Sequence, residues 1–136
     1  MQTMIKIAVD LEDYYDTPTN KIDNFNESLI NYMPGIGTHK CSTGMEGGFV
    51  ERLREGTYLA HVAEHCILEI QAMLGFDVKH GKTRVTENEK VYDIIYEYEL
   101  EKAGLLCGQI VIDMFNCMIS GKQYQFDEEF SNLQEK

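Results

Sequence analysis

Three stretches of the chain carry the pattern of a β-strand. Residues 4–11 alternate between apolar and polar side chains, as a strand with one buried face does. Residues 77–86 and 90–100 are also strand-like, and a polar turn, Glu87-Asn88-Glu89, joins them. Two strand-like runs connected by a short polar turn predict a β-hairpin.

Helical spacing of apolar residues marks four further stretches. The strongest signal runs over residues 49–74 and ends at Gly75, a residue type that is common at helix C-termini. We expect Gly56 to break this stretch in two, with Thr57 as the N-cap of the second part. Three other helices are predicted over residues 24–32, 101–119 and 126–133.

This order of elements predicts an α+β fold, in which helices pack on a small antiparallel or mixed sheet and a helical pair ends the chain. The length of 136 residues suits one domain with one hydrophobic core. We therefore expect a single domain over residues 1–136, with its core over about 1–100 and the C-terminal helices over about 101–136.

Charge and cysteine usage narrow the classes of function. A formal net charge of −11 leaves no basic surface for a nucleic-acid backbone, whereas it suits cationic partners or a metal ion. No run approaches the roughly 18 apolar residues of a membrane span, and the N-terminus lacks a signal-peptide pattern. The four cysteines form no C-x-x-C pair. We therefore expect reduced thiols and a cytoplasmic protein that binds neither nucleic acid nor membrane.

The segment His61-Val62-Ala63-Glu64-His65 matches the H-x-x-E-H motif of inverted zinc peptidases. Residues four apart on a helix lie one turn above each other, so both imidazoles can reach a single metal ion. Glu64 lies on the same side of the helix and suits a general base that acts on water. The alternative is that the two histidines and the glutamate form a solvated polar stripe.

The third ligand of such a site is not selected by spacing. A catalytic zinc usually takes three protein ligands, and carboxylates are plentiful in this chain. Glu97 and Glu99 point to the same face of a predicted strand, so one of them could meet the metal helix. An acidic strand end that faces water explains these two residues equally well.

Two further features suit substrate binding. The glycine-rich segment 42–48 does not match a nucleotide-binding loop, but its glycines permit close backbone approach. We place Ser42, Gly47 and Gly48 of this segment at the substrate. Arg84 could bind a carboxylate through its guanidinium fork. The alternatives are a plain connecting loop and an arginine that offsets the surrounding acids.

Landmark residues in a fixed order extend over nearly the whole chain. They are Leu11-Glu12, the Cys41-Ser42 loop with Gly47-Gly48-Phe49, Glu51-Arg52, Glu55-Gly56-Thr57, His61, Glu64-His65, Leu68-Glu69, Gln71, Gly81-Lys82-Thr83-Arg84, Glu97-Tyr98 and Ala103-Gly104. In these residues the chain resembles the N-terminal domain of cyanophycin synthetase.

The resemblance implies a module that holds cyanophycin, a poly-aspartate backbone with arginine on each side chain. In that family an ATP-grasp module and a Mur-ligase-like module make the polymer. The N-terminal domain in many members also carries a metallopeptidase-like site that trims polymer into primers. On this pattern His61 and His65 are zinc ligands, Glu64 is the catalytic base and Glu97 is the preferred third ligand.

We therefore expect a Zn²⁺-dependent hydrolase domain that binds a cyanophycin-like polymer and cleaves its backbone amide bonds. Two alternatives stay open: a non-catalytic module that anchors the polymer for a synthetase, and a structural domain with exposed histidines. The chain carries neither of the synthetase modules, so we do not expect it to make the polymer itself. Those modules are its expected protein partners.

Overall fold

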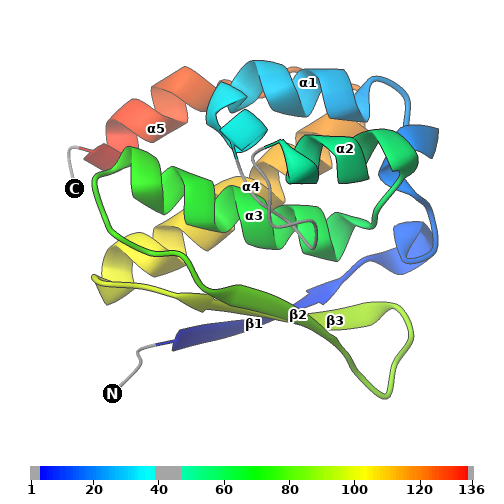
Figure 1. Ribbon diagram of the computed structural model, residues 1–136, viewed down its shortest axis with the longest axis horizontal. Coiled ribbons are helices and arrows are strands. Elements are labelled where there is room, and N and C mark those ends of the chain that lie inside the picture. The colour runs from blue at the N-terminus through cyan, green and yellow to red at the C-terminus, as the bar shows by residue number, and fades with distance from the viewer. Residues whose placement is uncertain (1–3, 39–46, 135–136) are drawn as a thin grey trace.

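The computed structural model describes residues 4–38 and 47–134. Its base is an antiparallel three-stranded sheet in the order β1-β3-β2, formed by β1 (Met4–Asp10), β2 (Gly81–Val85) and β3 (Val91–Glu97). Helices lie on one face of this sheet, and no described helix covers the other, which we call the open face (Figure 1). The predicted α+β class and the predicted hairpin are both confirmed.

Two tiers of helices cover the sheet (Figure 1). In the described residues, α3 (Leu59–Met73) packs on β2 and β3, and α4 (Glu101–Ile119) packs beside it against β1. The outer tier consists of α1 (Phe25–Tyr32), α2 (Gly48–Glu55) and α5 (Phe126–Gln134). Short 3-10 turns complete the described elements over Glu12–Tyr14, Thr19–Lys21 and Pro34–Thr38.

The break in the longest helical signal falls where expected. Gly56 ends α2 with a φ of 103°, a backbone conformation that favours glycine. The prediction that Thr57 caps α3 is wrong, because Tyr58 is the N-cap and makes no side-chain capping bond. The Thr57 hydroxyl is instead 3.0 Å from Nδ1 of His61, one turn into the helix.

Both strands of the hairpin are shorter than the strand-like runs in the sequence. The Asp77 amide donates to the Glu99 carboxylate at 2.9 Å, and the Lys79 amide donates to the Glu97 carboxylate at 2.8 Å. Side-chain acceptors thus bind the amides of Asp77, Lys79 and His80 before Gly81, where one backbone bond, from the Glu97 amide to the His80 carbonyl, continues the ladder. This arrangement explains why regular pairing covers only part of the predicted 77–86 and 90–100 runs.

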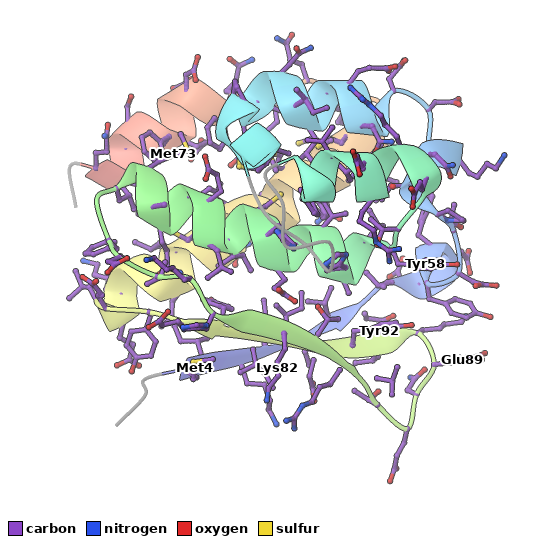
Figure 2. All side chains as sticks on the ribbon, viewed as in Figure 1. Met4, Tyr58, Met73, Lys82, Glu89 and Tyr92 are labelled. Carbon is purple, nitrogen blue, oxygen red and sulfur yellow. The ribbon has the colours of Figure 1, made fainter. Side chains whose placement is uncertain are left out.

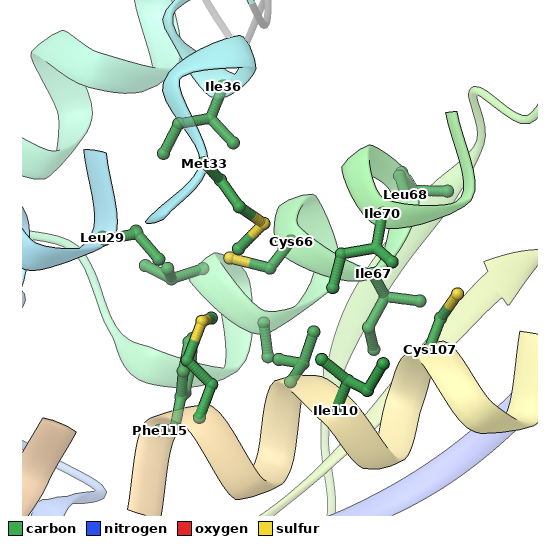
Figure 3. Packing of buried hydrophobic residues seen from close by; sticks show 14 of the residues in the cluster. Leu29, Met33, Ile36, Cys66, Ile67, Leu68, Ile70, Cys107, Ile110 and Phe115 are labelled. Atoms are coloured by element: carbon green, nitrogen blue, oxygen red, sulfur yellow. The ribbon is translucent and has the colours of Figure 1, made fainter. Parts of the chain in front are cut away.

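The hydrophobic core does not stop near residue 100. Cys107, Val111 and Met114 of α4 are fully buried in the same cluster as α1 and α3. Figure 3 shows side chains from the α1 region, α3 and α4 meeting at its centre, among them Leu29, Met33, Cys66, Ile67, Ile110 and Phe115. The expected division into a core and separate C-terminal helices is therefore corrected, because α4 is a central core element.

Helix α4 is also long and apolar enough to cross a membrane. Its 18-residue window has a mean hydropathy of 1.3, so the expectation that no run approaches such a length needs this correction. The apolar character has a local explanation, because eight residues of α4 are buried against α3 and the sheet. Length and composition alone are weak support for a membrane span.

Two glycines allow α4 to lie close to the sheet. A Cβ atom at Gly104 would be 2.8 Å from Cδ1 of Ile5 and 3.0 Å from Cβ of Tyr98, and one at Gly108 would be 2.9 Å from the Tyr96 hydroxyl. The hydroxyl of buried Tyr96 donates to the Gly104 carbonyl at 2.9 Å. This contact fixes the spacing between α4 and β3, and it has no room for a larger residue.

We predict that Gly104→Val lowers the free energy of unfolding by about 1–3 kcal/mol, because the added side chain must displace packed neighbours. Gln109→Val places the same side chain on the exposed side of α4 and should change that free energy by only about 0.5 kcal/mol. Urea-induced unfolding followed by circular dichroism measures both values. Equal losses in the two variants would contradict the close approach of α4 to the sheet.

Candidate active site

Helix α3 brings His61, Glu64 and His65 to one side of the fold. The two imidazole rings lie nearly perpendicular, with centroids 4.8 Å apart. Glu64 and His65 are each only 8% exposed, and His61 is half-buried. This burial shows that the residues do not form a solvated polar stripe and that the domain does not simply expose its histidines, so both alternatives are wrong. Charged and polar groups are seldom buried without a partner.

Glu64 is held by the strand beneath it. The hydroxyl of Thr83 on β2 donates to Oε1 of Glu64 at 2.8 Å. Gly81, two residues earlier, lies so close that a Cβ atom there would be 3.0 Å from Cγ of Glu64. Burial raises the pKa of the Glu64 carboxyl, and the hydrogen bond from Thr83 offsets part of this shift. The result is a fixed carboxylate that takes up a proton more readily than an exposed glutamate.

The His61 imidazole is oriented from within its own helix. Its Nδ1 atom is within hydrogen-bond distance of the Thr57 hydroxyl, which leaves Nε2 on the other side of the ring. Burial lowers the pKa of His61, and the positive charge of Arg52 lowers it further. A neutral imidazole with one nitrogen held by a hydrogen bond is the form that binds metal ions.

The His65 imidazole is stacked on an aromatic ring. Its centroid lies 4.0 Å from that of Phe49, and the two ring planes differ by 15°. Phe49 is fully buried and follows Gly47 and Gly48 at the start of α2, where Gly47 has a φ of 84°. The glycine-rich segment therefore reaches the histidines through Phe49, whereas Ser42 lies outside the described residues.

Glu97 is placed elsewhere. Its Oε1 atom accepts hydrogen bonds from the amides of Lys79 and His80 at 2.8 and 3.2 Å. These bonds lower the pKa of the Glu97 carboxyl. Its carbonyl accepts from Gln71, which lies six residues beyond His65 on α3. The structure thus does not bring Glu97 to the two imidazoles, and the Glu99 carboxylate is bonded to the Asp77 amide.

A metal centre is only partly assembled in the described part of the chain. Across residues 4–38 and 47–134, no three His, Cys, Asp or Glu side chains are grouped so that they could hold a metal ion. His61 and His65 supply two neighbouring imidazoles, which are suitable donors for zinc. The metal and its third ligand therefore stay predictions.

Arg84 lies on the opposite side of the sheet from Glu64. Side chains alternate along β2, and Thr83 points to α3, so Lys82 and Arg84 point to the open face. Figure 2 shows Lys82 extending from the sheet away from the helices. In the pairing with β3, Arg84 is opposite Asp93. Arg84 is thus separated from the histidines but remains exposed for a ligand on the open face.

Sequence reasoning missed four residues that support this site: Thr57, Thr83, Phe49 and Arg52. The signal for Thr57 was its position four residues before His61, which is one helical turn. Strand alternation would have assigned Thr83 and Arg84 to opposite faces. Nothing in the spacing indicated the stacking of Phe49 on His65, because the two belong to different helices.

We predict that Glu64→Gln raises the free energy of unfolding of the metal-free protein at neutral pH. Burial raises the pKa of this carboxyl in the folded protein above its ordinary value of 4.5. The wild type therefore loses stability as the pH rises from 4.5 through the pKa of the folded state. Glutamine does not titrate, and its amide oxygen still accepts a bond from Thr83. The advantage of the variant should therefore grow above pH 4.5. Urea unfolding at several pH values measures it, and an advantage that grows toward acid would contradict the burial of this charge.

Comparison with known proteins identifies the family. The sequence profile described as Cyanophycin synthase-like N-terminal domain matches residues 6–120. Cyanophycin synthetases from Geminocystis herdmanii and Synechocystis sp. are 38% and 36% identical to the chain over 132 residues, and the one from Crocosphaera subtropica is 35% identical over 135 residues. Each match covers 97% of this chain.

The chain spans only 15 to 16% of the length of these curated relatives. The profile match extends from β1 to the end of α4, and so includes the sheet, the H-x-x-E-H helix and most of the core. The resemblance seen in the landmark residues is confirmed, and the chain belongs to the cyanophycin synthase-like N-terminal domain family.

Proposed function

We propose that this domain is a metal-dependent hydrolase that cleaves backbone amide bonds of a cyanophycin-like polymer. The observations that support the proposal best are the two neighbouring imidazoles of His61 and His65 and the burial of the Glu64 carboxylate on the same helix, α3. A buried carboxylate beside histidines in a packed fold costs stability, and such costs are concentrated at functional sites. A module that only anchors polymer has no need of this arrangement.

His61 and His65 would hold a zinc ion. The hydrogen bond between Thr57 and Nδ1 of His61 orients this ring, in the manner of groups that orient metal-binding histidines. When bound, zinc supplies a Lewis acid that polarises an amide carbonyl and makes water a better nucleophile. For Glu97 to serve as the third ligand, its carboxylate, whose Oε1 accepts from the Lys79 and His80 amides, would have to move to the two imidazoles.

Glu64 would carry the proton. In amide hydrolysis the water oxygen bonds to the carbonyl carbon, the carbon–nitrogen bond breaks, and one proton must move from the water to the leaving nitrogen. Glu64 accepts that proton and then donates it to the nitrogen. The raised pKa of its carboxyl suits both halves of this task, because transfer is most effective when the pKa approaches the working pH. Thr83 would keep the carboxylate in position.

The polymer is supported by chemistry as well as by family. The relatives are named cyanophycin synthetases, and the resemblance implies a polymer of aspartate and arginine. Arginine groups are cationic and would be attracted by a chain with a net charge of −11. We infer that the substrate is this polymer or one with the same alternation of backbone amides and charged side groups.

We predict that the purified protein binds close to one equivalent of zinc and that His61→Ala loses it. Metal binding requires neutral imidazoles, and burial lowers the pKa of His61, so the bound metal should be released only as the pH falls below the ordinary imidazole value of 6.5. His80→Ala is the matched control, since this histidine is exposed and the variant keeps the backbone amide that donates to Glu97. Elemental analysis measures the metal, and polymer cleavage by metal-free wild type would contradict the zinc assignment.

We predict that Glu64→Gln lowers the rate of polymer cleavage by about 10²–10⁴-fold while zinc content and polymer binding persist, because only the proton carrier is lost. Glu99→Gln, a change at an exposed carboxylate bonded to the Asp77 amide, should leave the rate unchanged. Release of shortened polymer is the readout. Unchanged cleavage in Glu64→Gln would mean that another base or a contaminating hydrolase is responsible. Bound polymer that wild type never cleaves would instead support the anchoring module.

A further inference from the structure

Strand β2 is an edge of the sheet, and its outer backbone groups are unpaired in the described structure. The amide of Glu97 donates to the carbonyl of His80, and paired residues in an antiparallel ladder alternate between bonded and non-bonded. Lys82 and Arg84 therefore bond to β3, whereas the N–H and C=O groups of Gly81, Thr83 and Val85 point outward. Within residues 4–38 and 47–134, no hydrogen bond to these outward groups is present.

This free edge lies directly beside Glu64. The Thr83 hydroxyl donates to the Glu64 carboxylate at 2.8 Å, and Gly81 lies in near contact with the same side chain. The backbone at Gly81 can lie this close to Glu64 because glycine has no Cβ atom. A chain that paired with β2 would therefore pass along the carboxylate that is proposed to carry the proton.

We propose that the free edge of β2 binds the polymer backbone as an added antiparallel strand and so presents an amide bond to Glu64. The inference rests on the proposed function, because it places the substrate of that same site. Addition of an extended chain to a sheet edge supplies affinity through main-chain hydrogen bonds, and pockets for alternate side groups supply specificity. A poly-aspartate backbone has the amide spacing that such pairing needs.

The charges beside the edge fit the side groups of this polymer. Alternate residues of an added strand would lie on the open face, next to Lys82 and Arg84. Each arginine of the polymer carries a free carboxylate, which the guanidinium group of Arg84 can bind through two parallel hydrogen bonds. The predicted role of Arg84 is thereby placed on the open face of the sheet rather than at the histidines.

Strand β1 provides an internal control, because it is the other edge of the same sheet. The Leu11 amide donates to the Lys90 carbonyl, so the backbone groups of Lys6 and Ala8 point outward by the same alternation. This edge adjoins α4 and is separated from β2 by β3, so it lies away from the Thr83 hydroxyl that binds Glu64. Pairing that is specific for the site should involve β2 alone.

Backbone amide exchange, followed by NMR, tests the pairing on the full chain carrying Glu64→Gln. The probe is a synthetic four-repeat oligomer of aspartate with arginine on each side chain. We expect the amides of Thr83 and Val85 to exchange about tenfold more slowly with oligomer, while those of Lys6 and Ala8 do not change. Bound oligomer without this protection, equal protection of both edges, or no binding would each overturn the proposal.

A proline at Val85 separates the pairing from the chemistry. Val85 is 77% exposed and its N–H lies outside the ladder, so Val85→Pro removes one outward donor without breaking a bond to β3. We expect kcat/KM for polymer cleavage to fall about five- to tenfold, whereas Val85→Ala, which keeps the N–H, stays near wild type. Equal cleavage by Val85→Pro and Val85→Ala would overturn the proposed edge pairing but not the proposed hydrolase function. Slower amide exchange of Thr83 and Val85 with oligomer, without any polymer cleavage by wild type, would overturn the proposed hydrolase function but not the edge pairing.

Discussion

The packing of α3 on the β2–β3 hairpin is the constraint on which the candidate site depends. This contact buries one face of α3 in the core and also encloses Glu64, which a water-facing helix would leave hydrated. The single hydroxyl of Thr83 compensates for part of the lost hydration. The helix and the strand thus determine each other's positions through a polar contact at the border of an apolar interface.

The histidines depend on the same packing in a different way. Thr57 precedes α3 and Phe49 belongs to α2, so each imidazole is oriented by a residue outside the H-x-x-E-H segment. The core behind α3 fixes the helix rotation, because Val62, Cys66 and Ile70 are completely buried on the side away from the site. Rigid support of this kind keeps the imidazoles of His61 and His65 in one geometry.

Much of this fold could be predicted from periodicity, because local pattern and tertiary burial agree. The bounds of α4 match the predicted 101–119 helix, since apolar residues recur along its whole buried side. The site was harder to predict. The pairing of Glu64 with Thr83 depends on which face of β2 meets the helix, and Glu97 was assigned to the metal although its carboxylate binds the backbone at residues 79 and 80. Neither fact is local in sequence.

The edge of β2, which no described residue pairs, also bears on association between copies of this chain. Free strand edges are templates for aggregation, and proteins discourage that with charged residues on the edge. If two copies met through β2 in antiparallel register centred on Thr83, Lys82 of one would face Arg84 of the other, and like charges directly opposite are destabilising. A strand that carries carboxylates at those positions meets attraction instead. The two cations thus disfavour pairing between copies of this chain and favour an added strand whose side groups present carboxylates.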